Sequence, residues 1–517
     1  MSFDDVNLFL TDVLADHARR HPEKPALVCA GETITWAQFD GAINRCANAL
    51  ISAGLKKGER VAVLMGPSTQ CVVNMFAAVR SGGVLVPVGT MLSEDQLATL
   101  LADSGARYIF VSSEFRQQVD AVRDRLPDMR GGGLVSLDWS GDGWTPLENF
   151  LAGASEEKPQ VRFKPLDPYS IMYSSGTTGL PKGVVHSHRA RGYFAYSNTI
   201  EMRFDSDSRS AITTALYTAA SWLMLIPTLF AGGTVHILKG FDPTLWIETI
   251  AREGITHTFV VPAQIIALLQ HPALDGGNFN TLKTVLSAGS PLRPDVKERW
   301  LERFPNSFYE LYGFTEGAAA LLKPVDHAAR PASVGAPLLG TEFVVIDAEG
   351  NVLPAGEPGE LCGHCPGLMT GYHGREEATA EAIWRDALGR SFMRSGDIGS
   401  MDENGFVTIL DRKKDMIISG GMNIYPTDLE AVFGKHPDVA DVSVIGMPDE
   451  KWGETPLACV IIKPQSTVSA DELAQWVNER LAKYQRVRNV RLVDELPRNA
   501  LGKVLKRELR RIHAEER

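Results

Sequence analysis

The chain has 517 residues, of which 44% are apolar and 22% charged, and its formal net charge is −11. This length exceeds one simple core, so two to four structural units are expected, and the apolar content excludes large-scale disorder. The negative charge argues against an extended nucleic-acid surface, so we expect no nucleic-acid partner.

The first 170 residues alternate helix and strand patterns. Apolar spacing and apolar runs predict helices over 6–20, 37–53, 68–80 and 94–104, and strands over 26–28, 60–65, 83–88 and 108–111. Strands that alternate with helices form mainly parallel sheets with helices on both faces.

A second α/β series follows residue 170, and the sequence pattern changes near residue 335. Strands are predicted over 209–216, 234–238, 256–261 and 283–287, with a helix over 243–253. Short strands between Gly and Pro turns, over 342–346, 360–363 and 406–410, then indicate a small antiparallel barrel or sheet. After the charge run 411–415, strands over 441–445 and 457–462 and helices over 427–433 and 470–481 indicate an α+β domain. We place the boundary at Arg412, giving domains 1–411 and 412–517.

No segment is predicted to cross a membrane. The longest apolar stretch, residues 215–231, contains polar residues and a proline, whereas a span needs about 20 mostly apolar residues. The first residues lack the basic start of a signal peptide, and the last carry no peroxisomal address. We therefore expect a cytoplasmic protein.

The six cysteines give little support for a metal site. Only Cys362 and Cys365 are closely spaced, and a zinc knuckle would need a second such pair. We expect reduced thiols in a strand that enters a turn.

The loop Ser174-Ser-Gly-Thr-Thr-Gly-Leu-Pro-Lys-Gly183 carries the strongest chemical signal. It follows a predicted strand over 170–173, and its small residues leave backbone N–H groups open to an anion, to which Lys182 adds charge. The loop lacks the Gly-Lys-Ser/Thr of a Walker P-loop. Taken alone, it predicts an anion cradle, with a flexible linker as the alternative.

The sequence Tyr173 to Gly183 resembles the signature of the adenylate-forming superfamily, which includes the acyl-CoA synthetases of the AMP-dependent synthetase and ligase family. Six further motifs follow in the family's order, beginning at Ser287, Tyr312, Ser395, Asp411, Ser419 and Pro497. The resemblance implies an α/β fold, in which a large N-terminal domain of two doubly wound α/β subdomains and a small β-barrel precedes a mobile α+β domain. It places the hinge at Lys414.

The resemblance implies a nucleotide site and a catalytic set. For ATP it implies Ser174, Ser175, Gly176, Thr177, Thr178, Gly179, Lys182, Ala288, Gly289, Ser290, Tyr312, Gly313, Thr315, Asp397 and Arg412. Lys503 and Thr178 are implied as catalytic, as is Glu316, which would also hold Mg²⁺. On a tight loop, Asp397 could accept both ribose hydroxyls. A lysine acyltransferase acting on Lys503 is a further implied partner, and a homodimer stays open.

The acid and its acceptor are less well defined. The implied acyl pocket consists of Tyr217, Trp222, Val261, Gln264, Ala288 and Phe314, and Ser419, Gly420 and Gly421 form the implied coenzyme A loop. Tyr217 stands where many relatives have histidine. The pocket shows no obvious partner for a second substrate charge, so an apolar monocarboxylic acid is expected. An enzyme that loads a carrier protein, a luciferase-like enzyme and a nucleotide-binding regulator remain alternatives. Arg486, Arg488 and Arg491 could meet coenzyme A phosphates or form a solvated face.

Overall fold

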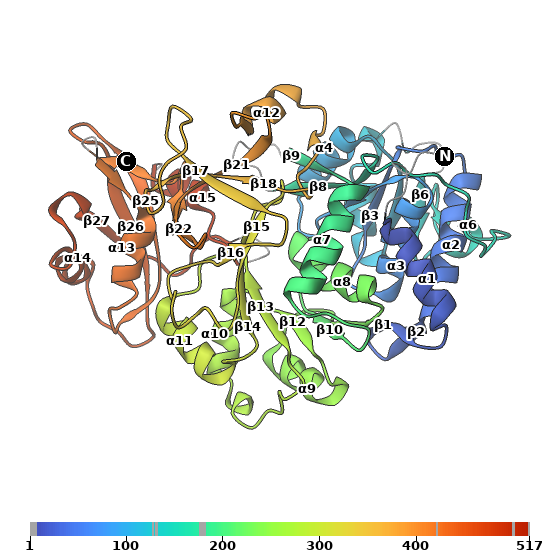
Figure 1. Ribbon diagram of the computed structural model, residues 1–517, viewed down its shortest axis with the longest axis horizontal. Coiled ribbons are helices and arrows are strands. Elements are labelled where there is room, and N and C mark those ends of the chain that lie inside the picture. Colours follow the sequence, from blue (N-terminus) through green and yellow to red (C-terminus); the bar gives the residue numbers. More distant parts are fainter. Residues whose placement is uncertain are drawn as a thin grey trace.

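A computed structural model describes residues 8–126, 129, 133–174, 182–419, 422–498 and 502–514. Its helices are α1 (Leu10–Arg20), α2 (Trp36–Ser52), α3 (Thr69–Arg80), α4 (Glu94–Ser104), α5 (Arg116–Asp120), α6 (Leu147–Phe150), α7 (His188–Glu201), α8 (Ala219–Ala231), α9 (Pro243–Glu253), α10 (Pro262–Gln270), α11 (Pro294–Arg303), α12 (Glu376–Glu381), α13 (Pro426–Phe433), α14 (Ala470–Asn478) and α15 (Lys506–Ala514). Figure 1 shows the C-terminal elements at the left, next to β17 and β22.

An eight-stranded sheet contains β3 (Arg60–Leu64), β4 (Val84–Pro87), β5 (Ala106–Val111), β6 (Leu134–Ser136), β7 (Thr145–Pro146), β8 (Pro168–Ser174), β9 (Lys182–Ser187) and β19 (Gly371–Tyr372). The strand order is β19-β9-β8-β4-β3-β5-β6-β7. Strands β3 to β8 run parallel, and β9 and β19 close one edge antiparallel.

A nine-stranded sheet contains β1 (Pro25–Cys29), β2 (Glu32–Thr35), β10 (Arg209–Ile212), β11 (Thr234–Ile237), β12 (His257–Phe259), β13 (Thr284–Ala288), β14 (Phe308–Gly313), β15 (Ala319–Leu322) and β16 (Ala336–Pro337). Its order is β16-β15-β14-β13-β12-β10-β11-β1-β2. Strand β1 pairs with β11 although β8 and β9 belong to the other sheet, so the two α/β units are interleaved along the chain.

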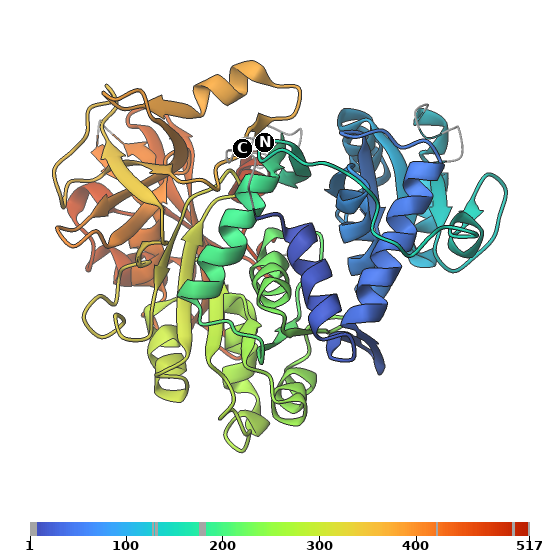
Figure 2. The same ribbon diagram turned by 45° about the vertical axis from the view of Figure 1, so that its right-hand side comes forward.

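One apolar core joins the two large sheets. It combines Phe39 of α2, Phe76 of α3, Leu225 of α8, Leu85 of β4 and Leu286 of β13. Figure 2 shows dark blue and green helices between the blue strands and the yellow-green strands. Burial of this continuous core fixes the two sheets relative to each other, which gives the strand ends a rigid support.

Two smaller sheets complete the chain. The first contains β17 (Glu342–Ile346), β18 (Gly359–His364), β20 (Ile383–Arg385), β21 (Ser391–Met401) and β22 (Val407–Arg412), all antiparallel. The second contains β23 (Ile417–Ser419), β24 (Met422–Ile424), β25 (Val439–Asp449), β26 (Gly453–Ile462) and β27 (Asn489–Leu492), and α13 and α14 pack on it. The α/β class with a small C-terminal α+β domain is confirmed.

Capping residues and glycines in the sequence correctly predict the ends of two helices. The predicted helices 94–104 and 243–253 are α4 and α9, because Ser93 and Asp242 cap their N-termini and Gly105 and Gly254 end them in left-handed conformation. The predicted strand 209–216 is too long, since β10 ends at Ile212 and the chain then turns toward α8.

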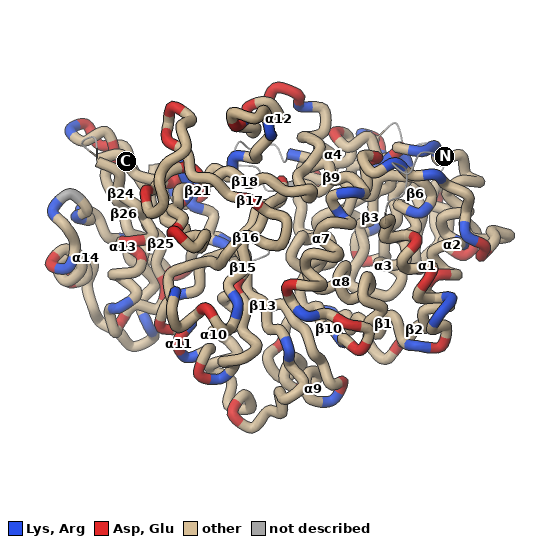
Figure 3. The backbone as a smooth tube through the Cα atoms, in the orientation of Figure 1, with Lys and Arg blue, Asp and Glu red and all other residues tan. Residues whose placement is uncertain are grey.

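Charge is dispersed over the surface. Figure 3 shows Lys and Arg interspersed with Asp and Glu along the whole outline in this view. Cys362 and Cys365 are both buried, and burial raises the pKa of Cys362 to about 12. Within the described ranges, every helix is too short or too polar to span a bilayer.

Candidate active site

The ends of paired strands bring two predicted motifs together. Strands β13 and β14 run parallel with Ala288 opposite Leu311, so the segment from Ala288 to Ser290 lies beside the segment that starts at Tyr312. Gly289 has φ +96°, which a side chain would strain. Carboxyl ends of parallel strands are where open α/β sheets bind ligands, and both motifs lie there.

The predicted anion loop begins and ends in a β-hairpin. Ser174 of β8 pairs with Lys182 of β9. Ser175, Gly176, Thr177, Thr178 and Gly179 lie outside the described residues, so their predicted phosphate contacts stay predictions.

Tyr372 links Lys182 to Glu316. The Lys182 Nζ lies 4.8 Å from the centre of the Tyr372 ring, and the Tyr372 hydroxyl donates to Glu316 Oε1 at 2.7 Å. Burial, with the Glu316 charge, raises the pKa of Tyr372. A cation from the anion loop and a predicted metal-binding carboxylate thus contact one aromatic side chain. Sequence reasoning missed Tyr372, although Gly371 and Tyr372 come shortly after the turn at Pro366 and Gly367.

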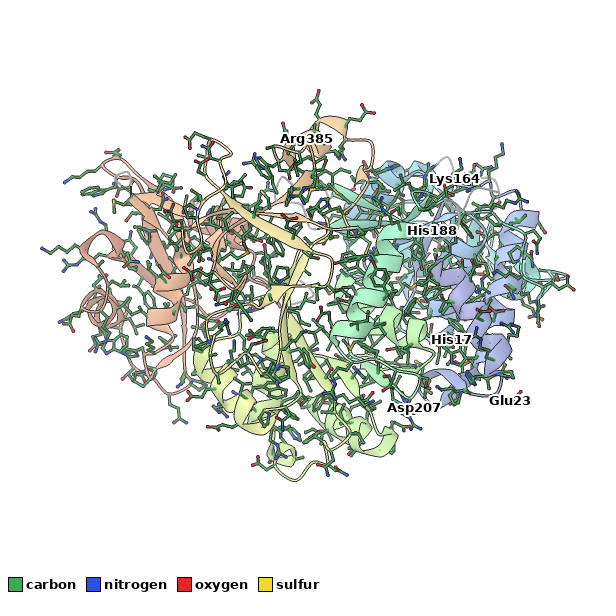
Figure 4. All side chains as sticks on the ribbon, viewed as in Figure 1. His17, Glu23, Lys164, His188, Asp207 and Arg385 are labelled. Carbon is green, nitrogen blue, oxygen red and sulfur yellow. The ribbon has the colours of Figure 1, made fainter. Side chains whose placement is uncertain are left out.

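A cavity of about 620 Å³ adjoins this cluster. Its wall includes Tyr372 and is completed by Val185, Thr370, Gly371, His373, Gly374, Arg375, Glu376, Thr379, Ala380, Ile383 and Arg385. Arg385 lies at the top of the molecule in Figure 4, on the arm that α12 and β20 form. Tyr372 therefore connects the Glu316 carboxylate to a space bordered by both polar and apolar groups.

Asp397 is the centre of a second cluster. It accepts from the Tyr312 hydroxyl at 2.6 Å and pairs with Arg412 Nε at 2.7 Å. Its side chain is only 4% exposed, and burial raises its pKa while Arg412 opposes that rise. The prediction that Asp397 lies on a tight loop is wrong. Asp397 lies inside strand β21, opposite Arg412 of β22, and the left-handed Gly396 before it supplies the bend.

Lys503 of the C-terminal domain lies near this cluster. The charges of Arg412, Asp397 and Lys414 all act on its ammonium group, and Gly502 lies beside Ala263 of α10 in the N-terminal domain. Burial lowers the pKa of Lys503 to about 8; repulsion from Arg412 adds to this shift and attraction to Asp397 opposes it. Three of the predicted nucleotide residues, Tyr312, Asp397 and Arg412, thus lie near the predicted catalytic lysine.

This pKa predicts an alkaline limit to activity. Below about pH 8 Lys503 is mainly the ammonium form, and above it mainly the neutral amine. If Lys503 has the catalytic role that the resemblance implies, kcat/KM for ATP, which reports the free enzyme, should be flat below about pH 8 and fall about tenfold per pH unit above it. Initial rates of pyrophosphate exchange across a pH series would measure this, and a profile that stays flat far into the alkaline range would contradict it.

Ion pairs hold the residues on either side of Lys414. Lys413 Nζ contacts Glu360 of β18 at 2.9 Å, and Glu360 also accepts from Arg394 at 2.6 Å. Asp415 accepts from Arg510 of α15 at 2.8 Å. The chain is therefore tied to the N-terminal domain just before Lys414 and to the C-terminal domain just after it.

The predicted acyl-pocket residues lie in or next to several different helices and strands. Ala288 is the last residue of β13, and Phe314 follows the neighbouring strand β14. Val261 caps α10, where its N–H donates to Gln264 Oε1 at 3.0 Å. Tyr217 precedes α8 and is half-buried, with Gly89 beside its ring.

Trp222 has the contacts of a core residue. Its indole N–H donates to the Leu216 carbonyl at 2.9 Å, and its ring packs on Tyr169 and on the Arg191 guanidinium, 4.4 Å from the ring centre. These contacts place it in the core that joins α7, α8 and β8. A role as a pocket wall stays a prediction.

A buried polar chain that the sequence did not reveal supports the site. Arg191 donates to Ser170 Oγ at 3.1 Å and to His186 Nδ1 at 3.0 Å, so His186 Nε2 carries the proton donated to the Thr315 carbonyl at 2.8 Å. Strand β8, which leads to the anion loop, is thereby tied to the motif that carries Glu316. The neighbouring His188, labelled in Figure 4, is instead packed among aromatic rings, and burial lowers its pKa to about 4.

The predicted coenzyme A loop is only partly described. Ser419 ends β23 and pairs with Met422 and Gly453, while Gly420 and Gly421 lie outside the described residues. Arg488 contacts Asp449 at 3.9 Å, and Arg491 belongs to β27.

Sequence comparisons cover nearly the whole chain. The sequence model of the AMP-binding enzyme family matches residues 14–373, and that of the AMP-binding enzyme C-terminal domain matches 428–503. A feruloyl-CoA synthase from Amycolatopsis is 35% identical over 96% of this chain and 97% of its own length. The fatty acid–[acyl-carrier-protein] ligase ScoC of Streptomyces coeruleorubidus is 34% identical over 97% and 96%.

Solved structures agree with these matches. ATP-bound MatB from Rhodopseudomonas palustris superposes with a TM-score of 0.89 at 29% identity, covering 98% of this chain and 100% of that one. The similarity therefore extends over both domains.

Proposed function

This chain belongs to the AMP-binding enzyme family and is an ATP-dependent acyl-CoA ligase, and we propose that it activates an apolar monocarboxylic acid as an acyl-adenylate in the site around Asp397 and Lys503. The observation that carries this proposal is the convergence of Tyr312, Asp397 and Arg412, which come from two sheets, with Lys503, which comes from a loop of the C-terminal domain. ATP and coenzyme A are its co-substrates.

The first step has a clear electrostatic requirement. A substrate carboxylate must approach the α-phosphate of ATP, and the two anions repel. A cation between them would stabilise the charge that builds up in the transition state. The nearness of Lys503 to the charges of Arg412 and Asp397 supports this role for it. The β- and γ-phosphates would lie near Lys182, and the ribose near Asp397.

The residues present fit Mg²⁺ bound together with ATP. Glu316 supplies one carboxylate, and the described part of the chain holds no cluster of three or more His, Cys, Asp or Glu side chains suited to a metal. Mg²⁺ accepts such a site, since it is often bound by one or two carboxylates plus phosphate oxygens. Bound there, it would neutralise phosphate charge, while Tyr372 orients the Glu316 carboxylate.

The second step would require Lys503 to leave. We propose that the C-terminal domain rotates about Lys414, which lies between the Lys413–Glu360 and Asp415–Arg510 contacts. A few residues between two packed bodies can absorb such a change in backbone torsions. Rotation would bring the Ser419 loop toward the adenylate and admit the coenzyme A thiol. Acylation of Lys503 by an acyltransferase would remove the charge that the first step needs.

An apolar acid is supported by the described pocket residues. Val261, Ala288 and Phe314 are apolar, and burial favours the neutral form of Tyr217, whose pKa it raises. The names of two relatives, a feruloyl-CoA synthase and a fatty acid ligase, suggest aromatic and aliphatic acids of this kind.

An acid panel tests the proposal. Coenzyme A-dependent AMP release should appear with aliphatic or aromatic monocarboxylates, and much less with dicarboxylates of equal length, because a second charge would be buried without a partner. Preference for a dicarboxylate would overturn the proposed acid class. Acid-dependent pyrophosphate exchange without coenzyme A turnover, followed by transfer to a carrier protein, would favour the carrier-loading alternative. Light emission with oxygen would favour a luciferase-like enzyme.

A further inference from the structure

Arg293 forms a contact between the two domains away from the nucleotide site. It precedes α11, and its Nη1 donates to the Ala440 carbonyl of β25 at 3.0 Å. Its Nε and Nη2 donate to the Asp295 carboxylate at 3.1 and 2.7 Å. The guanidinium is therefore held in place by its own domain while it binds the other.

The segment that Arg293 contacts continues to the loop of Lys503. Asp441 follows Ala440 and pairs with Arg498, and Arg498 also donates to the Gly502 carbonyl. The hydrogen bond to Asp295 raises the pKa of Arg293, and the negative charge of Asp441 raises it further. A series of contacts thus runs from Arg293 to Ala440, and from the adjacent Asp441 through Arg498 to Gly502, the residue before Lys503.

The loop that carries Lys503 is braced at its base. Arg498 pairs with Val504 in an antiparallel bridge, and the Leu505 N–H donates to the Pro497 carbonyl at 2.8 Å. Because the base is fixed, a shift of Asp441 and Arg498 moves Gly502 and Lys503 with them.

We propose that Arg293 is a positioning residue that stabilises the domain orientation in which Lys503 reaches the nucleotide site. The inference rests on the proposed two-step function. A rotation of the C-terminal domain that withdraws Lys503 carries Ala440 away from Arg293, so the contact exists in one orientation and is lost in the other. A contact made in only one of two states shifts the equilibrium toward that state.

The test separates the two half-reactions in Arg293→Ala. Acid-dependent pyrophosphate exchange should fall about five- to tenfold, the effect of losing one charge-assisted hydrogen bond at a partly exposed contact. Coenzyme A-dependent consumption of synthetic octanoyl-AMP or benzoyl-AMP should stay unchanged or rise. Arg293→Lys, which keeps the charge near Asp441, should recover part of the exchange rate.

Arg299→Ala is the matched control. Arg299 lies on α11, which Arg293 precedes, and its guanidinium donates at 3.3 Å to the Leu269 carbonyl within its own domain, so neither half-reaction should change. Equal loss of both half-reactions in Arg293→Ala, or an unchanged exchange rate, would overturn the proposal.

Hydrogen exchange provides a readout that needs no substrate. The amides of Val504 and Leu505 should exchange faster in Arg293→Ala than in the unmodified protein or Arg299→Ala, because the base of the loop loses its anchor. Unchanged exchange there would count against the contact. If the unmodified protein activates no acid, the proposed function fails, and this measurement still decides whether Arg293 anchors the loop.

Discussion

Replacement of Lys503 by alanine is expected to lower adenylation by about 10²- to 10³-fold, the usual effect of removing one preorganised charge from a transition state. Thioester formation from supplied acyl-AMP should change far less, because the proposed rotation takes Lys503 out of the site before coenzyme A reacts. Pyrophosphate exchange measures the first half-reaction, and coenzyme A-dependent acyl-AMP consumption measures the second.

Lys435→Ala provides the control for Lys503. Lys435 is an exposed lysine of the same domain, just after α13, and its loss should affect neither step. If Lys503→Ala slowed both half-reactions equally, the lysine would act in both steps, and the proposed division of labour between domain orientations would be wrong.

The sequence could assign Tyr312, Asp397 and Arg412 to one predicted site because each lies in a short segment that resembles a family motif. The structure joins them within hydrogen-bond distance. Residues that support the site had no comparable signal. Tyr372 and His186 act through single contacts across different strands, and a lone Tyr or His in a strand pattern indicates a core residue equally well.

Local sequence patterns also could not predict how the strands are distributed between the sheets or how the domains meet. Strand β1 looks like the first member of the series that continues with β3, yet it pairs with β11, more than two hundred residues later. Similarly, the basic C-terminal segment does not reveal that Lys503 reaches Arg412 and Asp397. Both depend on long-range packing, which short-range periodicity does not encode.

Asp397→Asn should weaken ATP binding about 10- to 100-fold, since a charged hydrogen-bonding group contributes about 1.5–3 kcal/mol. The substitution keeps the shape of the side chain but removes the charge that pairs with Arg412 and would accept the ribose hydroxyls. Equilibrium titration with ATP measures the loss, and thermal unfolding shows how much of it is a loss of stability.

Tyr312→Phe separates the charge of Asp397 from its hydrogen bond to Tyr312. It removes only the 2.6 Å donor, so ATP binding should weaken by no more than about tenfold. The two substitutions should also differ in pH dependence. Asp397 raises the pKa of Lys503, so Asp397→Asn should move the alkaline limb of kcat/KM to lower pH, whereas Tyr312→Phe should leave it in place. If both variants kept the limb of the unmodified enzyme, Asp397 would not act on Lys503 during catalysis, and its role would be confined to the nucleotide.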